Sequence, residues 1–275
     1  MKKISLADWT QFSVRQTTRS YRSKDEKLML KWVEAKEAAY VDSINYEYKM
    51  GRIAAELGVP TPKAIEMVET DNGGIGVVYE NVKDKISFSR AISQDPDRLE
   101  YYVKGFTKVV KQFHATEADT KELPSVLDRI EDGLKATQIF SEKEKDYIRN
   151  EVAKLPSGTK CLHGDLQLSN AITSPSGDYI IDLGTMSYGN PIFDVGTMYD
   201  LAHYSPEELS LSIFHFDMKT LMKCWEIYAK EYFNTSSLKD AEAEVLPYAR
   251  FSNMVILPIV PDAETVFNAR NMILG

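Results

Sequence analysis

One stretch, residues 161–200, constrains this 275-residue chain more than any other part of it. The stretch contains Asp165 in the run HGDL, then Asn170 five residues later, then Asp182 in the run IDLG. Between Asn170 and Asp182, the turn-forming run SPSGD precedes the apolar, β-branched run YII, which predicts the return strand of a hairpin. We therefore expect Asp182 at a strand end, facing Asn170 across the turn.

These three residue types are typical of phosphoryl transfer. A phosphoryl group in transfer carries delocalised negative charge, so the protein has to supply position, divalent cations and an acceptor for the hydroxyl proton. Asp165 is the candidate proton acceptor. Asn170 and Asp182 are the candidate metal ligands, because Mg²⁺ prefers oxygen ligands and keeps several waters.

Two other interpretations fit parts of the same stretch. Asp and Asn are common in turns because their side chains bond the local backbone, so HGDL alone would fit an ordinary loop. A hydrolase using His163, Asp165 and Ser169 would lack the G-x-S-x-G run that presents a nucleophilic serine. The three polar residues in register around a strand favour the phosphoryl-transfer interpretation.

The N-terminal part predicts strands at residues 11–15, 20–22 and 27–33, followed by a helix at residues 42–58. Asp42 or Ser43 would cap the start of this helix and Gly58 would end it. Lys31 lies in the third strand, and Glu47 on the helix is its candidate partner, with Glu56 a weaker alternative. A lysine on a strand is more often only a solvated residue, so its position before the helix is what favours a pair.

A second hairpin is predicted from strands at residues 64–69 and 75–82, because Asn72-Gly73 supplies the positive φ that a tight turn needs. Its second strand leads into Lys83, so residues 80–82 are the predicted hinge between two lobes. There the backbones of Glu80 and Val82 are candidates for binding an adenine edge. An ordinary strand end explains the same residues on the local sequence alone.

The chain after residue 97 predicts mainly helices. Apolar residues at spacings of three and four (Leu99, Tyr102, Phe106, Val109 and Phe113) predict the first. Further helices are expected at residues 125–140, from Ser141 with a capping box to Glu144, from Ser205 with Pro206 at N1 and Glu208 at N3, and at residues 219–233, 238–257 and 263–274.

Charge and composition exclude several classes of function. Net charge is −8, with 12 basic and 12 acidic residues in 1–82 and 21 and 29 in 83–275, which argues against a nucleic-acid partner. No apolar run is long enough to span a membrane and no signal peptide is apparent, so we expect a cytoplasmic protein with no membrane partner. Cys161 and Cys224 are expected to be buried thiols, and the histidines lack zinc-ligand spacing.

With Lys31 in an N-terminal sheet, HGDLQLSN and IDLG, the chain resembles the aminoglycoside phosphotransferase and choline kinase group, small-molecule kinases related to protein kinases. The resemblance covers most of the chain. It implies an α+β, bilobal, protein-kinase-like fold, with a small antiparallel-sheet lobe that carries one helix and a larger, mainly helical lobe. It places a nucleotide-binding lobe at residues 1–82 and a catalytic and substrate-binding lobe at residues 83–275.

The resemblance also implies roles for individual residues. Asp165 would orient or deprotonate the acceptor hydroxyl, Asn170 and Asp182 would hold Mg²⁺, and Lys31 with Glu47 would grip the phosphates of ATP or, as an alternative donor, GTP. Asp194 in NPIFDVG would brace the catalytic loop.

One departure from the family concerns residues 16–20, where a glycine-bearing loop usually covers the phosphates. This chain has QTTRS, so backbone amides and hydroxyls such as that of Thr18 would have to cap phosphate with side chains in the way. Slow turnover, a GTP donor, or a catalytically degenerate protein that binds a nucleotide or metabolite are therefore alternatives. A protein kinase is disfavoured, because Gly164 replaces the arginine of H-R-D and no A-P-E follows.

The expected acceptor is a hydroxyl of a small molecule. Its pocket would be formed by the helices after residue 200, where Asp200, His203, Tyr204 and Glu207 are candidates. The acidic balance of this part of the chain weakly favours an amine-bearing acceptor. The sequence makes no prediction about oligomeric state.

Overall fold

A computed structural model describes residues 1–14, 18–36, 38–258 and 269–274. The chain forms two compact units. The first consists of Met1–Lys85 with Thr173–Gly184, and the second of Ile86–Ile172 with Thr185–Gly275. The chain therefore returns to the first unit for one short segment before it completes the second.

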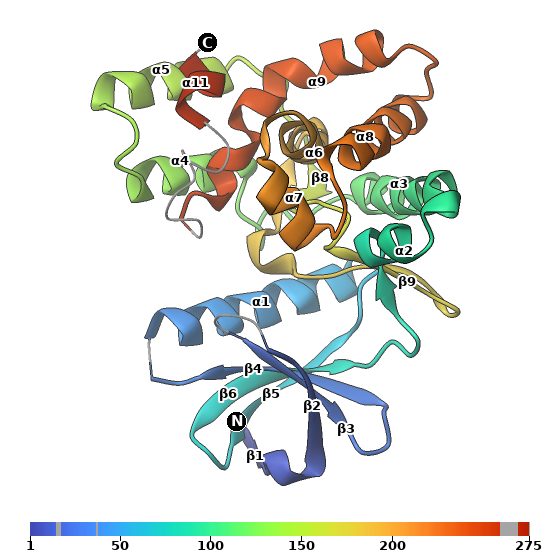
Figure 1. The fold of residues 1–275 in the computed structure, drawn as a ribbon. Coiled ribbons are helices and arrows are strands. Elements are labelled where there is room, and N and C mark those ends of the chain that lie inside the picture. The colour runs from blue at the N-terminus through green and yellow to red at the C-terminus, as the bar shows by residue number, and fades with distance from the viewer. Residues whose placement is uncertain (15–17, 37, 259–268, 275) are drawn as a thin grey trace. The chain divides into compact units, whose positions relative to one another are not determined.

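The first unit contains a six-stranded sheet with the strand order β1-β5-β6-β4-β3-β2 (Figure 1). The strands are β1 (Lys2–Ile4), β2 (Trp9–Val14), β3 (Arg19–Ser23), β4 (Leu28–Glu34), β5 (Ala64–Thr70) and β6 (Gly74–Glu80). The three strands and the hairpin predicted from the sequence are confirmed as β2 to β6. The sheet is mixed, because β1 pairs parallel to β5, so the expectation of a purely antiparallel sheet was wrong at this edge. A strand of three residues is too short to show alternation in the sequence.

Strand alternation sends successive side chains of β4 to opposite faces of the sheet. Leu30 and Trp32 pack with Tyr21 on one face. Val33 packs with Ile44 of helix α1 (Ala38–Glu56) on the other face, which α1 covers. Lys31, two residues before Val33, therefore lies on the face that α1 covers.

Helix α1 begins earlier than the sequence predicts. Asp42 and Ser43 lie inside it, so neither is the N-cap that the pattern indicated. The predicted end is confirmed: Gly58 has φ +76°, its N–H donates to the Ala55 carbonyl at 3.2 Å, and the Val59 N–H donates to Ala54 at 2.9 Å. This glycine-terminated pattern satisfies carbonyls that the last turn leaves unpaired.

The segment that returns to the first unit carries most of the hairpin that was predicted ahead of Asp182. Its strands are β9 (Ala171–Ser174) and β10 (Gly177–Ile180), which are neighbours in one sheet. The Ile180 N–H donates to the carbonyl of Pro60 at 2.7 Å, so β10 is bonded to the connector between α1 and β5. The prediction of a hairpin ahead of Asp182 is confirmed.

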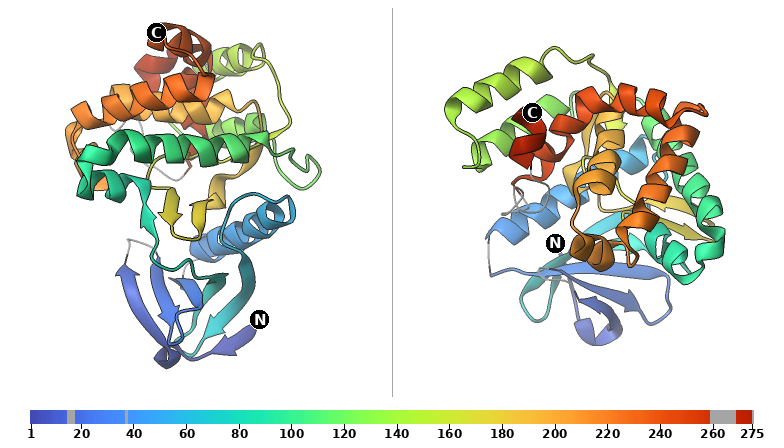
Figure 2. Two further views of the ribbon diagram at one scale, coloured as in Figure 1. Left: turned by 90° about the vertical axis from the view of Figure 1, so that its right-hand side faces the viewer. Right: turned by 45° about the horizontal axis from the view of Figure 1, so that its top comes forward.

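The second unit is mainly helical (Figure 2). Its helices are α2 (Phe88–Gln94), α3 (Leu99–Ala115), α4 (Val126–Ala136), α5 (Glu142–Val152), α6 (Ile192–Tyr204), α7 (Glu207–Ile213), α8 (Met218–Phe233), α9 (Leu238–Ser252) and α11 (Ala269–Leu274), with the 3-10 turns η2 (Pro96–Arg98), η3 (Leu183–Thr185, at the boundary) and η4 (Asn253–Ile256). Short strands β8 (Lys160–Leu162) and β11 (Ser187–Gly189) pair antiparallel, and β7 spans Ile86–Ser87. Helix α6 packs along α9, and α3 packs along α8.

The helix predictions are confirmed with shifted ends. Helix α4 ends at Ala136, four residues before the predicted end, and α2 was missed. Seven residues with one turn of apolar side chains give too short a pattern to predict α2. The predicted last helix is described only over 269–274, and residues 263–268 lie outside the described residues.

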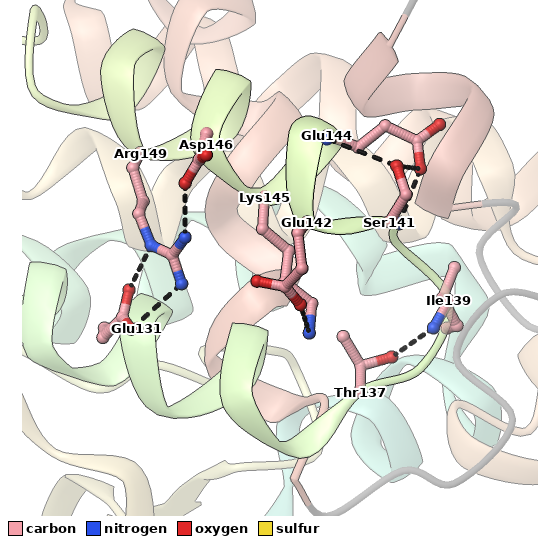
Figure 3. Close-up of polar contacts among 9 residues, drawn as sticks. All are labelled: Glu131, Thr137, Ile139, Ser141, Glu142, Glu144, Lys145, Asp146 and Arg149. Carbon is pink, nitrogen blue, oxygen red and sulfur yellow. Dashed lines mark hydrogen bonds and ion pairs between the residues drawn. The ribbon is translucent and has the colours of Figure 1, made fainter.

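Two predicted capping boxes have different outcomes. Ser141 and Glu144 form a complete box at the start of α5, shown with the neighbouring ion pairs of Arg149 in Figure 3. Ser205 does not cap α7, whose N-cap residue is Pro206, and the buried Ser205 hydroxyl has no hydrogen-bond partner among the described residues. The second prediction was wrong, because the chain leaves α6 at Ser205 and turns only after Pro206.

Cys161 and Cys224 are buried free thiols, as predicted. None of the described helices is both long enough and apolar enough to cross a lipid bilayer.

Candidate active site

Lys31 is the centre of a polar cluster in the first unit. Its Nζ donates to Glu47 Oε2 at 2.7 Å and to Asp182 Oδ1 at 3.1 Å, and the Tyr79 hydroxyl donates to Glu47 Oε1 at 3.0 Å. The predicted ion pair between Lys31 and Glu47 is confirmed. The weaker alternative is wrong, because Glu56 pairs with Arg52 on the helix surface.

Burial and charge compete at this cluster. The side chain of Lys31 is 18% exposed and that of Glu47 is 11% exposed. Burial disfavours the charged amine, but the carboxylates of Asp182 and Glu47 outweigh it and raise the pKa of Lys31 above its ordinary value. Lys31 therefore stays a cation at neutral pH. Burial raises the pKa of Glu47, and the ammonium of Lys31 opposes that shift.

Asp182 reaches Lys31 from the chain segment that follows β10. Its backbone has φ +67°, a left-handed conformation that Asp tolerates better than most residues. Asp182 lies between the end of β10 at Ile180 and the start of η3 at Leu183, where the chain changes direction. The sequence predicted the strand end but contained no sign that Asp182 would lie on Lys31.

Asp165 and Asn170 form a second polar pair, in the second unit. The Asn170 Nδ2 donates to the Asp165 carbonyl oxygen at 2.9 Å and to Asp165 Oδ2 at 3.0 Å. Both bonds use the amide nitrogen of Asn170 and fix its orientation. The amide oxygen Oδ1 is thereby directed away from Asp165, and an amide oxygen is a donor that Mg²⁺ accepts. The donor set therefore fits a magnesium ligand at Asn170.

Asp194 of α6 braces the turn that carries Asp165. Its two carboxylate oxygens accept the backbone N–H groups of His163 at 2.6 Å and Gly164 at 2.8 Å, and His114 Nε2 lies 3.0 Å from Oδ2. Burial opposes ionisation, but these hydrogen bonds and the charge of His114 lower the pKa of Asp194 below its ordinary value. The predicted bracing contact is confirmed.

Gly164 is required by the geometry of this turn. Its φ is +81°, and a Cβ at this position would lie 2.8 Å from the Thr185 carbonyl oxygen and 3.0 Å from Val255 Cγ1. A larger residue would have to displace backbone or strain the left-handed conformation. The same turn holds the His163 carbonyl, which accepts the Thr185 hydroxyl at 2.7 Å.

The remaining nucleotide-site candidates lie in the first unit. Glu80 is the last residue of β6, and its N–H already donates to the Lys63 carbonyl at 3.0 Å. Val82 follows two residues later and is half-buried. Thr18 is half-buried directly before β3, while Gln16 and Thr17 of the same loop lie outside the described residues.

The acceptor-pocket candidates differ widely in exposure. Asp200 is buried, with 1% of its surface exposed. Glu207 accepts the N–H of Met218 at 3.1 Å, which caps the start of α8. His203 stacks on Tyr199 with 4.0 Å between ring centroids, and Tyr204 is 43% exposed.

The predicted site residues thus form two local clusters, one in each unit. Lys31, Glu47 and Asp182 are together in the first unit, and Asp165 and Asn170 are together in the second. The predicted sharing of one metal by Asn170 and Asp182 therefore stays a prediction. Among the described residues no three His, Cys, Asp or Glu side chains form a metal-binding group, and a magnesium ion held by one amide and one carboxylate needs none.

Three contributors to these clusters were missed from the sequence. Tyr79 binds Glu47 from β6, His114 binds Asp194 from the end of α3, and Tyr232 of α8 lies 2.8 Å from His114 Nδ1. Each is an ordinary residue of a strand or helix in the sequence. Only the register of β6 and the packing of α3 against α6 and α8 assign them a polar partner.

The comparison with protein families settles the class of the chain. The family described as the phosphotransferase enzyme family, APH, matches residues 8–217. The chain belongs to this family. The predicted resemblance is confirmed, and the chain is a phosphotransferase by family. A comparison with curated proteins gives no match.

Solved structures show the same fold at low sequence identity. A choline/ethanolamine kinase family protein from Mesorhizobium loti is 16% identical, with 97% of this chain and 84% of that chain covered and a TM-score of 0.56. Aminoglycoside phosphotransferase APH(3'')-Id from Streptomyces rimosus is 17% identical, with 90% and 93% covered and a TM-score of 0.54. A thermostable mutant of aminoglycoside phosphotransferase APH(4)-Ia is 12% identical, with 97% and 90% covered and a TM-score of 0.58. The predicted α+β, protein-kinase-like fold is confirmed.

Proposed function

We propose that this phosphotransferase moves the γ-phosphate of ATP, with Mg²⁺, to a hydroxyl group of a small molecule. The observation that most supports this proposal is the Lys31 cluster, in which a buried lysine is held by Glu47 of α1 and by Asp182 of the IDLG run. A lysine on this strand with a glutamate on the next helix is the pair that grips nucleotide phosphates in kinases.

Asp165 is the proposed acceptor of the hydroxyl proton. Its carboxylate is half-buried, and Asn170 Nδ2 holds one of its oxygens at 3.0 Å. The two N–H groups that Asp194 accepts fix the backbone on the N-terminal side of Asp165. A carboxylate held in this way loses little conformational freedom when it orients a substrate hydroxyl. Positioning of the reacting groups is the main contribution of the protein in a kinase.

The nucleotide is proposed to bind the N-terminal residues 1–82, and the acceptor to bind residues 83–275. Lys31 with Glu47 would hold the phosphates, and Thr18 would donate its hydroxyl or amide to them. The backbones of Glu80 and Val82 would bond the base edge. Because the Glu80 N–H is already used by Lys63, we expect the Glu80 carbonyl and the Val82 backbone to make these bonds.

Asn170 and Asp182 would hold the magnesium ion. When bound, Mg²⁺ offsets the negative charge of the transferring phosphoryl group. In this chain, Asn170 offers an amide oxygen whose orientation Asp165 fixes, and Asp182 offers a carboxylate beside the Lys31 cation.

GTP is an alternative donor, because the loop at residues 16–20 has no glycine to bring its backbone close to the phosphates of ATP. The acceptor class is proposed to be amino alcohols, aminoglycosides or sugars, with an amine-bearing molecule favoured by the acidic balance of residues 83–275.

The replacement Asp165→Ala tests the proposed activity. Transfer from Mg-ATP to a panel of amino alcohols, aminoglycosides and sugars should fall by about 10²–10⁴-fold, while nucleotide binding measured by calorimetry is retained. The matched control is Asp132→Ala, which removes an exposed aspartate of α4. If the wild-type protein transfers phosphate to none of the panel with either ATP or GTP, the proposal fails.

A second candidate is a degenerate kinase that binds a nucleotide or metabolite without transfer, which the glycine-free loop favours. A thermal-shift titration separates the two. Stabilisation by Mg-ATP that disappears in Asp182→Asn supports an assembled metal site. A shift that is the same without metal favours the sensor.

A further inference from the structure

Asp200 of α6 and Asn253, the first residue of η4, form a buried pair that the proposed mechanism does not use. They are 1% and 5% exposed, and Asn253 Nδ2 donates to Asp200 Oδ2 at 2.9 Å. The other oxygen of each side chain, Asp200 Oδ1 and Asn253 Oδ1, is buried and has no hydrogen-bond partner within the described residues.

An ionised Asp200 would leave two buried oxygen acceptors of this bonded pair unsatisfied. Each unsatisfied buried acceptor costs free energy, and an unpaired buried carboxylate costs more. A proton on Asp200 Oδ1 changes this balance, because a neutral carboxyl group donates one O–H while its second oxygen still accepts. One proton therefore satisfies both atoms, with Asn253 as donor at one end and acceptor at the other.

We infer that Asp200 is a positioning residue that acts as a neutral carboxylic acid, joined to Asn253 by two hydrogen bonds, and that this pair holds α6 and η4 together around the turn that carries Asp165.

A comparison with Asp194 on the same helix supports the protonation state. Both aspartates are 1% exposed. Asp194 accepts two N–H groups and lies beside His114, which lowers its pKa. Within the described residues Asp200 accepts a hydrogen bond from Asn253 alone, and burial raises its pKa well above the ordinary value. The phenol of Tyr199, the preceding residue of α6, interacts with Asp200, and among the described residues no cation on α8, α9 or η4 offsets the burial of Asp200.

The positioning role follows from what α6 and η4 contact. Helix α6 supplies Asp194, which accepts the N–H groups of His163 and Gly164. Turn η4 supplies Val255, whose Cγ1 lies 3.0 Å from the place where a Cβ of Gly164 would be. Both elements therefore contact Gly164. The Asp200–Asn253 pair bonds them to each other, and Asp165 is the next residue after Gly164.

The first test measures the protonation state and does not depend on the proposed function. The protein with ¹³C-carboxyl-labelled aspartate is compared by infrared spectroscopy with the same labelled protein carrying Asp200→Asn. At pH 7 the wild type should show the C=O band of a protonated carboxyl group, and Asp200→Asn should lack it. If Asp200→Asn removes only carboxylate intensity, Asp200 is ionised and the inference is overturned.

The second test measures the positioning role, and it rests on the proposed function. Asp200→Ala removes both hydrogen bonds, so we expect kcat to fall by about tenfold with KM for the nucleotide little changed. Asp200→Asn keeps a donor and an acceptor facing Asn253, so it should recover most of that loss. If Asp200→Asn is as impaired as Asp200→Ala, a charge is needed and the inference fails.

A third readout keeps the test independent of catalysis. Amide hydrogen exchange at His163 and Gly164 should be faster in Asp200→Ala than in the wild type and in Asp200→Asn. Unchanged exchange in Asp200→Ala would overturn the positioning role even if the variant melts at a lower temperature. If no variant and no wild-type protein transfers phosphate, the proposed function fails, and the infrared and exchange measurements still decide this inference.

Discussion

Two lysines of the first unit show how neighbouring side chains decide the state of one residue type. Lys31 lies between two carboxylates, and its pKa is raised. Lys85 directs its Nζ at the Met29 sulfur, 3.3 Å away, and at Asn81 Oδ1, 3.4 Å away. Burial and the nearby charge of Arg22 lower the pKa of Lys85 to about 8. The carboxylate partners of Lys31 stabilise its charge, whereas burial makes the charge of Lys85 unfavourable.

Replacing Lys85 by Met should stabilise the protein below pH 8. The pKa of Lys85 is about 8 in the folded state, against an ordinary lysine value of 10.5 for the unfolded chain. Between these values the unfolded chain binds more protons, so wild-type stability rises with pH, and below pH 8 the full cost is present. We expect Lys85→Met to raise the free energy of unfolding by about 1–2 kcal/mol at pH 7, allowing for partial exposure, and by less at pH 10.

Urea unfolding at both pH values measures this effect. The control is Lys83→Met, which removes an exposed lysine two residues away and should change stability little at either pH. An equal gain from Lys85→Met at pH 7 and pH 10 would show that the gain comes from packing and not from the proton.

Asp194→Asn should destabilise the second unit, because an amide group presents a donor to one of the two N–H groups that the carboxylate now accepts. We expect a loss of about 3 kcal/mol at pH 7 in urea unfolding. The lowered pKa of Asp194 gives stability that is present above its ordinary value near 3.8 and is lost as pH falls through the folded value. The difference between the wild type and the variant should therefore shrink in acid, whereas Asp132→Asn should show no difference at any pH.

Two helix starts with the same sequence pattern have different capping in the structure. Ser141 and Ser205 each precede a glutamate by three residues ahead of a helix, and both patterns predicted a capping box. At α5 both bonds of the box form, and Glu144 also binds Arg270 near the C-terminus. At α7 Pro206 is itself extended, with φ −71° and ψ 155°, so the helix begins at Glu207 and Ser205 lies one residue before the N-cap position.

Ser141→Ala and Ser205→Ala are a matched pair that tests this difference. Ser141→Ala should lower the free energy of unfolding by about 1 kcal/mol. The Glu144 N–H loses its acceptor, and the Glu144 carboxylate that accepts the N–H of residue 141 loses the hydroxyl that orients it. Ser205→Ala removes a buried hydroxyl that has no partner among the described residues, so it should be neutral or slightly stabilising. Thermal melts of the two variants side by side measure the effect, and equal losses would contradict the assignment.

At the scale of the whole molecule, the first unit is built from two separated parts of the chain. Residues 1–85 supply the sheet, α1 and Lys31, and residues 173–184 supply β10 and Asp182. The returning segment contributes the bond from Ile180 to Pro60 and the second carboxylate of Lys31. A single boundary in the sequence therefore cannot separate the two units, because residues 173–184 belong to the first unit.

A fragment of residues 1–85 should be less stable than the same fragment joined by a flexible Gly/Ser linker to residues 173–184. Without the segment, Lys31 keeps one of its two carboxylates, and losing a partner of a buried ion pair is costly. Urea unfolding followed by the fluorescence of Trp9 and Trp32 measures the two midpoints. In the joined fragment, Asp182→Ala should remove part of the gain in the urea midpoint. Equal midpoints for the 1–85 fragment, the joined fragment and its Asp182→Ala variant would show that the segment adds no stability.

The local features of this protein follow from short stretches of its sequence. Hydrophobic periodicity and turn residues act over fewer than about twenty positions. They predict the strands around Lys31, the two hairpins, the Ser141 cap and the spacing of Asp165, Asn170 and Asp182. The partnership of Lys31 with Glu47 was also predictable, because a strand and the helix that follows it are neighbours in chain and in space.

Contacts between side chains far apart in the chain depend on how the helices and strands pack. The contacts of Asp182 with Lys31, of Asp194 with the His163 turn, and of Asp200 with Asn253 join residues 151, 31 and 53 positions apart. The sequence shows Asp194 and Asp200 as similar aspartates of one helix. Packing decides that one is ionised and one is neutral, because the charge of a buried carboxyl group depends on the donors that other elements bring to it.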